Sequence, residues 1–414
     1  MAEWIGIDRR ARRCYGFDEI ALVPGVVSVN PAEVDTTWQL RELKFRVPFV
    51  ASAMDGVVDV RFAIEMSRLG GLAVLNLDGV QARYEDPTKA VAQIIQGDVQ
   101  ETTNIVQQLY KTPIQERLVA KRVQEIKKGK AVCAVSTIPQ NAERFGAIAQ
   151  EAGADIFVVQ STVTTARHLS TAYRALDFSK FVKSLNIPVI AGNVVTYDQG
   201  IEMMETGVDA LLVGVGPGAA CTTRGVLGVG VPQVTATVDL AAARDFYFKK
   251  TGRYVPIITD GGMRNGGDIC KAFACGSDAV MVGSAFAKAQ EAPGRGYHWG
   301  MAYPHSSLPR GTRIYVGTTG TLEQILFGPA QTDDGSQNLM GALTTCMGTV
   351  GTKDIKAFQL TEIIIAPSIQ TEGKIFQQVQ RVGMARKGAT EQPTNHNTPR
   401  ARRSRGASRS TTRA

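Results

Sequence analysis

Eight short runs of apolar, mostly β-branched residues recur along this chain, and longer amphipathic segments separate most of them. A continuous apolar run is typical of a parallel strand that is buried on both faces. The runs are 48–51, 72–75, 131–135, 156–159, 187–190, 210–213, 255–258 and 279–282. The segments with helical composition are 57–69, 142–152, 170–184, 198–206, 234–250 and 266–275. Eight such units predict an α/β fold, a (β/α)8 or TIM barrel. A doubly wound open sheet is the alternative, but it fits eight evenly repeated units less well.

The length of 414 residues suits one large barrel, and we expect a single catalytic domain over residues 1–385. Two stretches depart from a plain barrel. Residues 86–129 are long for one crossover and predict one or two extra helices. Residues 291–313 follow the eighth run and are rich in Gly, Pro, Tyr and His, so we expect a mobile flap there. Loops at the C-terminal ends of the strands build the active sites of barrels.

Positive charge is concentrated at the C-terminal end. Residues 386–414 hold eight basic residues and one acidic residue, so they carry +7 of the formal net charge of +8. Their Ser, Thr, Pro, Gly and Arg content predicts a disordered basic tail. The tail is either a solvated appendage or a weak anchor for nucleic acid or an acidic partner. It contains no aromatic residue to stack on bases, which weakens the nucleic-acid interpretation.

The chain has no apolar run near the roughly 20 residues that a membrane span needs, and its first residues lack a signal-peptide pattern. We therefore expect a cytoplasmic protein with no membrane partner. The six cysteines form no CxxC pair and match no zinc spacing, so we expect reduced thiols. Only four histidines are present, which argues against a histidine-rich metal centre.

The sixth run leads into a glycine-rich loop with the sequence GVGPGAACTTR at 214–224. Glycines allow the backbone to approach a ligand or an ion closely. Cys221 lies in this loop near Arg224, so we interpret it as a nucleophile and the other five cysteines as small core residues. The first glycines also match a GxGxxA dinucleotide fingerprint, which we discount because no obvious helix follows.

The seventh and eighth runs end in residues suited to bind a phosphate. Asp260 is followed by two glycines, Gly261 and Gly262, and the eighth run ends at Gly283 and Ser284. In barrels these two loops commonly bind phosphate through backbone N–H groups, although glycines also serve tight turns. The Asp260 carboxylate could accept from both hydroxyls of a ribose.

Polar residues also follow the first and fifth runs. Ser52 and Asn193 would lie at the mouth of the barrel, where they could orient a ligand. Met54 would either form an apolar platform under a flat ring or belong to the core.

These motifs resemble those of the IMP dehydrogenase/GMP reductase superfamily. The matching stretches cover nearly the whole body of the chain, and the cysteine loop with the DGG…GDI block is highly specific. They are FDEIALVPG at 17–25, SAMDG at 52–56, AGNVVT at 191–196, GVGPGAACTTR at 214–224, DGGMRNGGDICKAFACGSDAVMVGS at 260–284 and GTVGTKDI at 348–355.

The resemblance implies a reaction. Cys221 would attack C2 of the purine of IMP, a hydride would pass to NAD, and water would release xanthosine monophosphate. Thr223 matches the threonine that helps to activate this water, and Arg310 is a candidate partner for it, with Arg313 and Tyr303 as further candidates in the flap. The resemblance also implies a homotetramer.

The resemblance also assigns the binding residues. Gly262, Gly283 and Ser284 would hold the phosphate, Asp260 the ribose, and Ser52 and Met54 the other side of the nucleotide. The carbonyls of Gly216, Gly218 and Cys221 match a potassium-binding loop. Gln160, Ser161 and Asn193 would lie near the NAD cofactor.

The sequence also departs from the family pattern. The CBS pair that usually follows the second strand of the dehydrogenases is absent, as it is in the reductases. Gln160 stands in place of the aspartate that binds the cofactor ribose, and Ala219 in place of a phosphate-binding serine. The Arg–Tyr pair of the dehydrogenase flap has no clear match.

The choice of reaction depends on the flap. In the reductases a flap glutamate supports deamination of GMP, but no glutamate occurs from Ala292 to Leu322, and Arg310 stands at the matching place. This favours IMP dehydrogenase. GMP reductase with NADPH is the alternative, and a third hypothesis is a purine-nucleotide-binding protein without catalytic activity.

Overall fold

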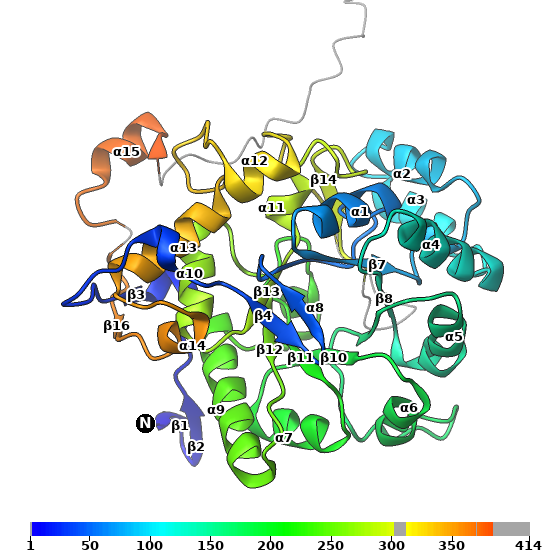
Figure 1. The fold of residues 1–414 in the computed structure, drawn as a ribbon, viewed down its shortest axis with the longest axis horizontal. Helices are drawn as coiled ribbons and strands as arrows, with labels where there is room; N and C mark the ends of the chain where they lie inside the picture. Colours follow the sequence, from blue (N-terminus) through cyan, green and yellow to red (C-terminus); the bar gives the residue numbers. More distant parts are fainter. Residues whose placement is uncertain (1, 302–311, 370, 384–414) are drawn as a thin grey trace, which may run out of the picture.

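The structure, a computed structural model, describes residues 2–301, 312–369 and 371–383. Eight parallel strands form a closed barrel in the order in which they occur along the chain (Figure 1). This confirms the predicted (β/α)8 fold, and each predicted run overlaps one strand. The strands are β6 (Phe49–Ala51), β7 (Leu72–Asn76), β8 (Ala134–Thr137), β9 (Ile156–Gln160), β10 (Val189–Val194), β11 (Ala210–Val213), β12 (Ile257–Asp260) and β13 (Ala279–Val282).

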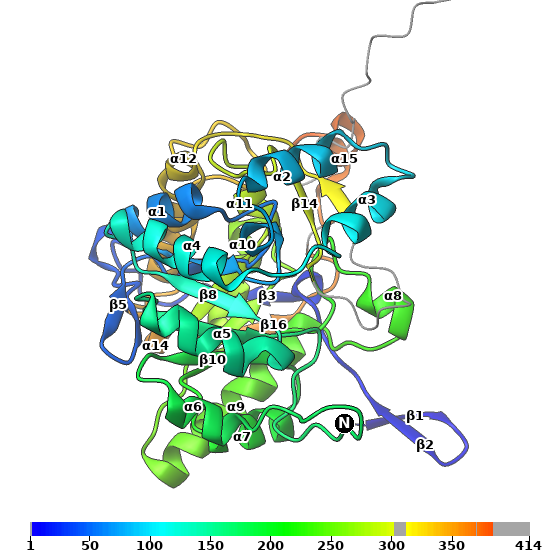
Figure 2. The same cartoon turned by 90° about the vertical axis from the view of Figure 1, so that its right-hand side faces the viewer.

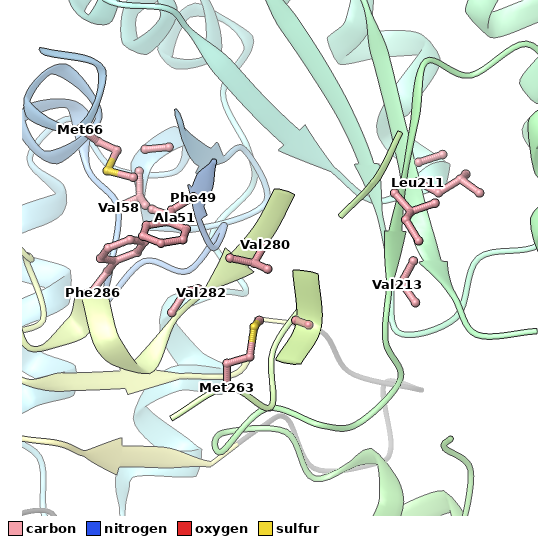
Figure 3. Packing of buried hydrophobic residues seen from close by; sticks show 14 of the residues in the cluster. Phe49, Ala51, Val58, Met66, Leu211, Val213, Met263, Val280, Val282 and Phe286 are labelled. Carbon is pink, nitrogen blue, oxygen red and sulfur yellow. The ribbon is translucent and has the colours of Figure 1, made fainter. Parts of the chain in front are cut away.

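Alternate residues of the strands face two different parts of the core, which explains why the strands are apolar throughout. Val50, Val74 and Met281 belong to the cluster inside the barrel. Phe49, Ala51 and Val280 belong to the cluster between the barrel and its helices. In Figure 3, Phe49 and Ala51 lie with Val58, Met66 of α1 and Phe286 in this outer layer.

A small hairpin closes one end of the barrel. Strands β4 (Trp38–Leu40) and β5 (Leu43–Phe45) pair antiparallel, and Trp38 stacks on Phe45 with the ring centroids 4.9 Å apart. Trp38, Leu40 and Phe45 belong to the same buried cluster as the inward-facing strand residues. The opposite end, where the strands finish, is therefore left for a ligand.

The helices around the barrel agree with most predicted segments. They are α1 (Val60–Arg68), α4 (Glu116–Lys128), α5 (Pro139–Glu151), α6 (Phe178–Ser184), α7 (Tyr197–Glu205), α9 (Gln233–Thr251) and α10 (Gly266–Ala274). The prediction for 170–184 was too long, because the side chain of Asp177 accepts from the Lys180 amide and caps α6 at that point.

The segment between β7 and β8 holds the short η3 (Val80–Ala82) and three helices, with no inserted domain. Helix α4 packs against α1 and α5 as a barrel helix does, and α2 (Pro87–Gln96) and α3 (Thr102–Leu109) are additional. This agrees with the prediction of one or two extra helices. It also agrees with the expected absence of a CBS pair.

The remaining elements lie outside the barrel. The hairpin of β1 (Ala2–Gly6) and β2 (Arg9–Arg12) projects from the body in Figure 2. Near the N-terminus lie η1 (Phe17–Glu19), η2 (Pro31–Glu33) and β3 (Ile20–Leu22), which pairs with β16 (Ile363–Ile365). After β13 follow α11 (Ser284–Ala287), α12 (Leu322–Phe327), α13 (Leu339–Thr349), α14 (Ile355–Phe358) and α15 (Ile375–Gln380).

The predicted flap contains regular structure at both of its ends. Strands β14 (Tyr297–Trp299) and β15 (Arg313–Tyr315) pair antiparallel. The middle of the predicted flap, 302–311, and the predicted tail, 386–414, lie outside the described residues. Among the described residues, no helix is long and apolar enough to cross a membrane.

Candidate active site

A pocket of about 1590 Å³ opens at the C-terminal ends of the barrel strands. It brings together residues that are more than 200 positions apart in the sequence, from the ends of at least five strands. Apart from Arg313, every predicted site residue that the structure describes lines it: Ser52, Met54, Gln160, Ser161, Asn193, Gly216, Gly218, Cys221, Thr223, Asp260, Gly262, Gly283 and Ser284. Arg310 and Tyr303 lie outside the described residues.

Three polar side chains at the strand ends form the floor of the pocket. The Asp260 carboxylate ends β12 and accepts from Asn193 Nδ2 of β10 at 2.8 Å. Gln160 Nε2 of β9 donates to the same Asp260 oxygen at 3.0 Å and to Asn193 Oδ1 at 3.1 Å. Burial raises the pKa of Asp260 to about 6, although these two amide donors oppose the shift. We call Gln160, Asn193 and Asp260 the polar floor.

The second Asp260 oxygen, Oδ1, accepts no hydrogen bond from the described residues, and the side chain lines the pocket. A buried carboxylate with a spare acceptor is suited to receive two hydroxyl donors of a ligand. The arrangement is therefore compatible with the predicted ribose contact of Asp260.

The cysteine loop forms the rim of the pocket. Cys221 is exposed, and its Sγ donates to Thr223 Oγ1 at 3.1 Å. The Cys221 amide donates to the Gly218 carbonyl at 3.0 Å, which closes a turn before the cysteine. Thr223 is 5% exposed and begins the five-residue helix α8 (Thr223–Leu227). Our expectation that no helix follows the loop was wrong, because five residues are too few to show helical periodicity.

Arg224 stabilises the cysteine loop by two hydrogen bonds to backbone carbonyls, a contact that we call the brace. Its Nε donates to the Val215 carbonyl at 3.2 Å and its Nη2 to the Val231 carbonyl at 2.7 Å. Gly216 lies against this side chain with φ +76°, and a Cβ on it would approach Arg224 Cγ to 2.6 Å. The backbone course around Gly216 therefore requires glycine.

The predicted phosphate loops lie side by side. Gly283 directly follows β13 and packs against the loop that follows β6, so that a Cβ on it would lie 3.0 Å from Met54 Sδ and 3.5 Å from Ser52 Oγ. Gly262 adopts φ +83° in the loop after β12. Ser284 begins α11, and its Oγ is 3.1 Å from His298 Nε2 in β14. The backbone of Gly262 and Gly283 and the hydroxyl of Ser284 therefore line one region of the pocket.

Sequence reasoning missed several residues that line the pocket, among them Asn76, Asp78, Thr137, His298 and Tyr315. Asp78 accepts from Thr137 Oγ1 and the Ile138 amide, both at 2.8 Å. Asn76, Asp78 and Thr137 stand at or just after the ends of the second and third strands, so the rule that found Asn193 would also have found them. His298 lies in the segment interpreted as a flap, 291–313, and Tyr315 lies two residues beyond it; no strand was expected at either place.

Arg313 is not among the residues that line the pocket. Its Nη1 donates to the carbonyls of Ile95 and Gly97 at the end of α2, at 3.1 and 3.0 Å. Its guanidinium also lies 5.0 Å from the centre of the Tyr297 ring. These contacts hold Arg313 at the end of α2 and beside Tyr297. A role for Arg313 in activating water stays a prediction.

The predicted ligands of a potassium ion are backbone oxygens. Among the described residues, no group of three or more His, Cys, Asp and Glu side chains could hold a metal ion. The carbonyls of Gly216, Gly218 and Cys221 are the ligand type that potassium takes, but the Gly218 carbonyl already accepts from the Cys221 amide. The potassium site stays a prediction.

Together, the fold and the pocket define a (β/α)8-barrel protein with a ligand site at the C-terminal ends of its strands. A model of the family described as the IMP dehydrogenase / GMP reductase domain matches residues 14–374. The chain belongs to this family, and we therefore describe it as an oxidoreductase of the IMP dehydrogenase / GMP reductase type.

Two relatives and one solved structure illustrate the similarity. An uncharacterized oxidoreductase of Mycolicibacterium smegmatis is 38% identical over 86% of this chain and 97% of its own length. An inosine-5'-monophosphate dehydrogenase of Cryptosporidium parvum is 32% identical over 82% of this chain and 88% of its own. The crystal structure of an IMP dehydrogenase/GMP reductase-like protein from Corynebacterium glutamicum superposes with a TM-score of 0.84 at 38% identity. It covers 88% of this chain and 97% of that one.

Proposed function

We propose that this protein is an IMP dehydrogenase, which oxidises IMP to xanthosine monophosphate with NAD⁺ as the hydride acceptor. The observation that carries the proposal is the contact of Cys221 Sγ with Thr223 Oγ1 at 3.1 Å, on the rim of a pocket with a buried carboxylate at its floor. A nucleophile beside a hydroxyl that can handle a proton is what covalent oxidation followed by hydrolysis needs.

In the proposed reaction the Cys221 thiolate attacks C2 of the purine, and the hydrogen at C2 leaves as a hydride to NAD⁺. This leaves a thioimidate between Cys221 and the purine. A water then attacks C2, with Thr223 and Arg310 in the proposed role of proton acceptors, and the carbon–sulfur bond breaks. The products are xanthosine monophosphate, NADH and one proton, and the thiol is regenerated.

The size of the pocket supports two ligands. Pockets for single small molecules usually measure roughly 300–1,000 Å³, whereas this pocket measures about 1590 Å³. IMP would occupy the side of Ser52, Asp260, Gly262, Gly283 and Ser284. NAD⁺ would occupy the side of Gln160, Ser161 and Asn193. Gln160 and Asn193 already bind each other and Asp260, so they would contact the cofactor through their remaining acceptor and donor positions.

GMP reduction with NADPH is the second candidate, since the family includes both activities. The absence of a glutamate from Ala292 to Leu322 counts against it, because arginine cannot supply a carboxylic acid. By analogy with the family we also propose a potassium-activated homotetramer in the cytoplasm. The basic tail is retained only as a weak candidate for nucleic-acid contact.

The test is absorbance at 340 nm with purified protein, IMP, NAD⁺ and potassium chloride, beside a reaction with GMP and NADPH. A rise with IMP is the expected result. A fall with GMP and release of ammonia would instead establish a reductase. Nucleotide binding with no change in either reaction would support the non-catalytic hypothesis and reject this proposal.

A further inference from the structure

His298 is a buried histidine beside the predicted phosphate site, and the proposed reaction gives it no role. It lies in β14 and is 1% exposed. Its Nε2 is 3.1 Å from Ser284 Oγ, whereas its Nδ1 is buried and has no hydrogen-bond partner among the described residues. One nitrogen of the ring is thus bound to Ser284, and the other has no hydrogen-bond partner in the part of the chain that the structure describes.

The backbone around His298 fixes this contact. His298 is opposite Ile314 in the pairing of β14 with β15. On the other side, β14 lies against Gly56, where a Cβ would approach the His298 Cα to 2.9 Å and the Tyr297 carbonyl oxygen to 2.7 Å. The Gly294 amide also donates to the Gly56 carbonyl at 3.0 Å. The histidine therefore has little freedom to move away from Ser284.

The chemistry of the pair decides which group donates. Burial lowers the pKa of His298 to about 4, so the ring is neutral at physiological pH and carries one proton. The oxygens of a fully ionised phosphate only accept hydrogen bonds, so Ser284 can bind it only by donating its own hydroxyl hydrogen. Ser284 Oγ must then accept from His298 Nε2–H. A proton on Nδ1 would instead leave a buried donor without a partner, which proteins rarely tolerate.

We propose that His298 is a positioning residue for the 5'-phosphate of the nucleotide: its Nε2–H donates to Ser284 Oγ and turns the Ser284 hydroxyl hydrogen toward the phosphate. This inference rests on the proposed function, because it requires a nucleotide at Gly283 and Ser284. It adds a specificity element, since the contact rewards a phosphorylated nucleotide over the free nucleoside.

The test compares binding of IMP and of inosine, which lacks the phosphate, by calorimetry in the absence of NAD⁺. His298→Phe keeps a flat ring but removes the donor, and we expect it to weaken IMP binding roughly three- to tenfold. Inosine binding should not change. His298→Gln keeps an N–H donor and should recover most of the loss. Ser284→Ala should weaken IMP binding to a similar extent, and adding His298→Phe to it should cause little further loss.

A structural role would give a different pattern. Equal weakening of IMP and inosine by His298→Phe, or additive losses in the double variant, would overturn the proposal, as would unchanged IMP binding. Because no turnover is needed, binding of IMP without NADH production would reject the proposed function but still test His298. If neither IMP nor GMP binds to the unaltered protein, both proposals fail.

Discussion

The floor and the rim of the pocket are built in different ways. The polar floor consists of side chains at the ends of β9, β10 and β12, and three hydrogen bonds join them to one another. The rim is a loop in which Cys221 is exposed and its neighbours are held mainly by backbone contacts. Strand ends fix the floor before any ligand binds, whereas the rim depends on glycines and on the brace from Arg224.

This difference suggests a division of labour between the two regions. Preorganised acceptors at the floor suit the binding of a ribose, which is needed equally in the ground state and the transition state. An exposed thiol at the rim suits covalent bond formation, because the bond between Cys221 and the ligand forms only during the reaction and not on binding. Changes at the rim should therefore lower kcat and those at the floor should raise KM.

The largest expected effect is at the rim. Cys221→Ala removes the proposed nucleophile, so kcat should fall by on the order of 10³-fold or more, while IMP binding and Tm stay close to those of the unaltered protein. The rate of NADH production measures kcat, and calorimetry measures IMP binding. Cys14→Ala is the matched control, because Cys14 is only half-buried and does not line the pocket. Retained turnover in Cys221→Ala would end the covalent mechanism.

A change at the floor should act on affinity. Asp260→Ala removes the carboxylate and leaves the amides of Gln160 and Asn193 without their shared acceptor. The loss of charged hydrogen bonds to a ribose should raise KM for IMP roughly tenfold to a hundredfold, with a smaller change in kcat. Initial rates over a range of IMP concentrations separate the two constants.

The control for this variant is Asp209→Asn. Asp209 is also largely buried and binds Arg41 at 2.7 Å, but it precedes β11 and lies away from the pocket. We expect a lower Tm and an unchanged KM. If Asp260→Ala lowers kcat far more than it raises KM, the division between floor and rim is wrong.

The barrel itself could be predicted from the sequence because its strands are apolar on both faces and evenly repeated. The same principle placed Asp260 and Asn193 at one end of the barrel, since parallel strands finish at the same edge. Sequence could not supply the bonds within the polar floor, because Gln160 and Asp260 are 100 positions apart and meet only after the barrel closes.

The weaker predictions were those on short or irregular segments. Helix α8 has five residues and shows no periodicity, and α6 begins at a cap that the sequence did not distinguish from the residues before it. His298 was overlooked because a histidine in a segment rich in Gly and Pro is typical of an exposed loop. Its burial depends on the pairing of β14 with β15 and on contact with Gly56.

The pH dependence of affinity tests the floor further. Asp260, with its pKa raised to about 6, is ionised above that pH and protonated below it. If the ionised carboxylate binds the ribose, KM for IMP should rise as pH falls below about 6, by up to roughly tenfold per unit.

The IMP phosphate also titrates near pH 6, and burial raises the pKa of Asp55 to about 6 as well. The relevant quantity is therefore the difference between the unaltered protein and Asp260→Asn, which should show a weaker dependence. Identical profiles would remove Asp260 from the ribose site.

The smallest expected effect on kcat is at Gly216, which packs against Arg224 in the cysteine loop. Gly216→Ala places a Cβ 2.6 Å from Arg224 Cγ at a residue with φ +76°, so the loop must shift to accommodate it. Strain of this kind costs on the order of 1–3 kcal/mol locally, and we expect kcat to fall roughly three- to tenfold while KM for IMP changes less.

Gly225→Ala is the control, because nothing lies within 4 Å of a Cβ there and the residue is helical, where alanine is favoured. Its kcat should remain that of the unaltered protein. If Gly216→Ala raised KM as strongly as Asp260→Ala does, the rim would contribute to binding as much as the floor, and the two regions would not be functionally distinct.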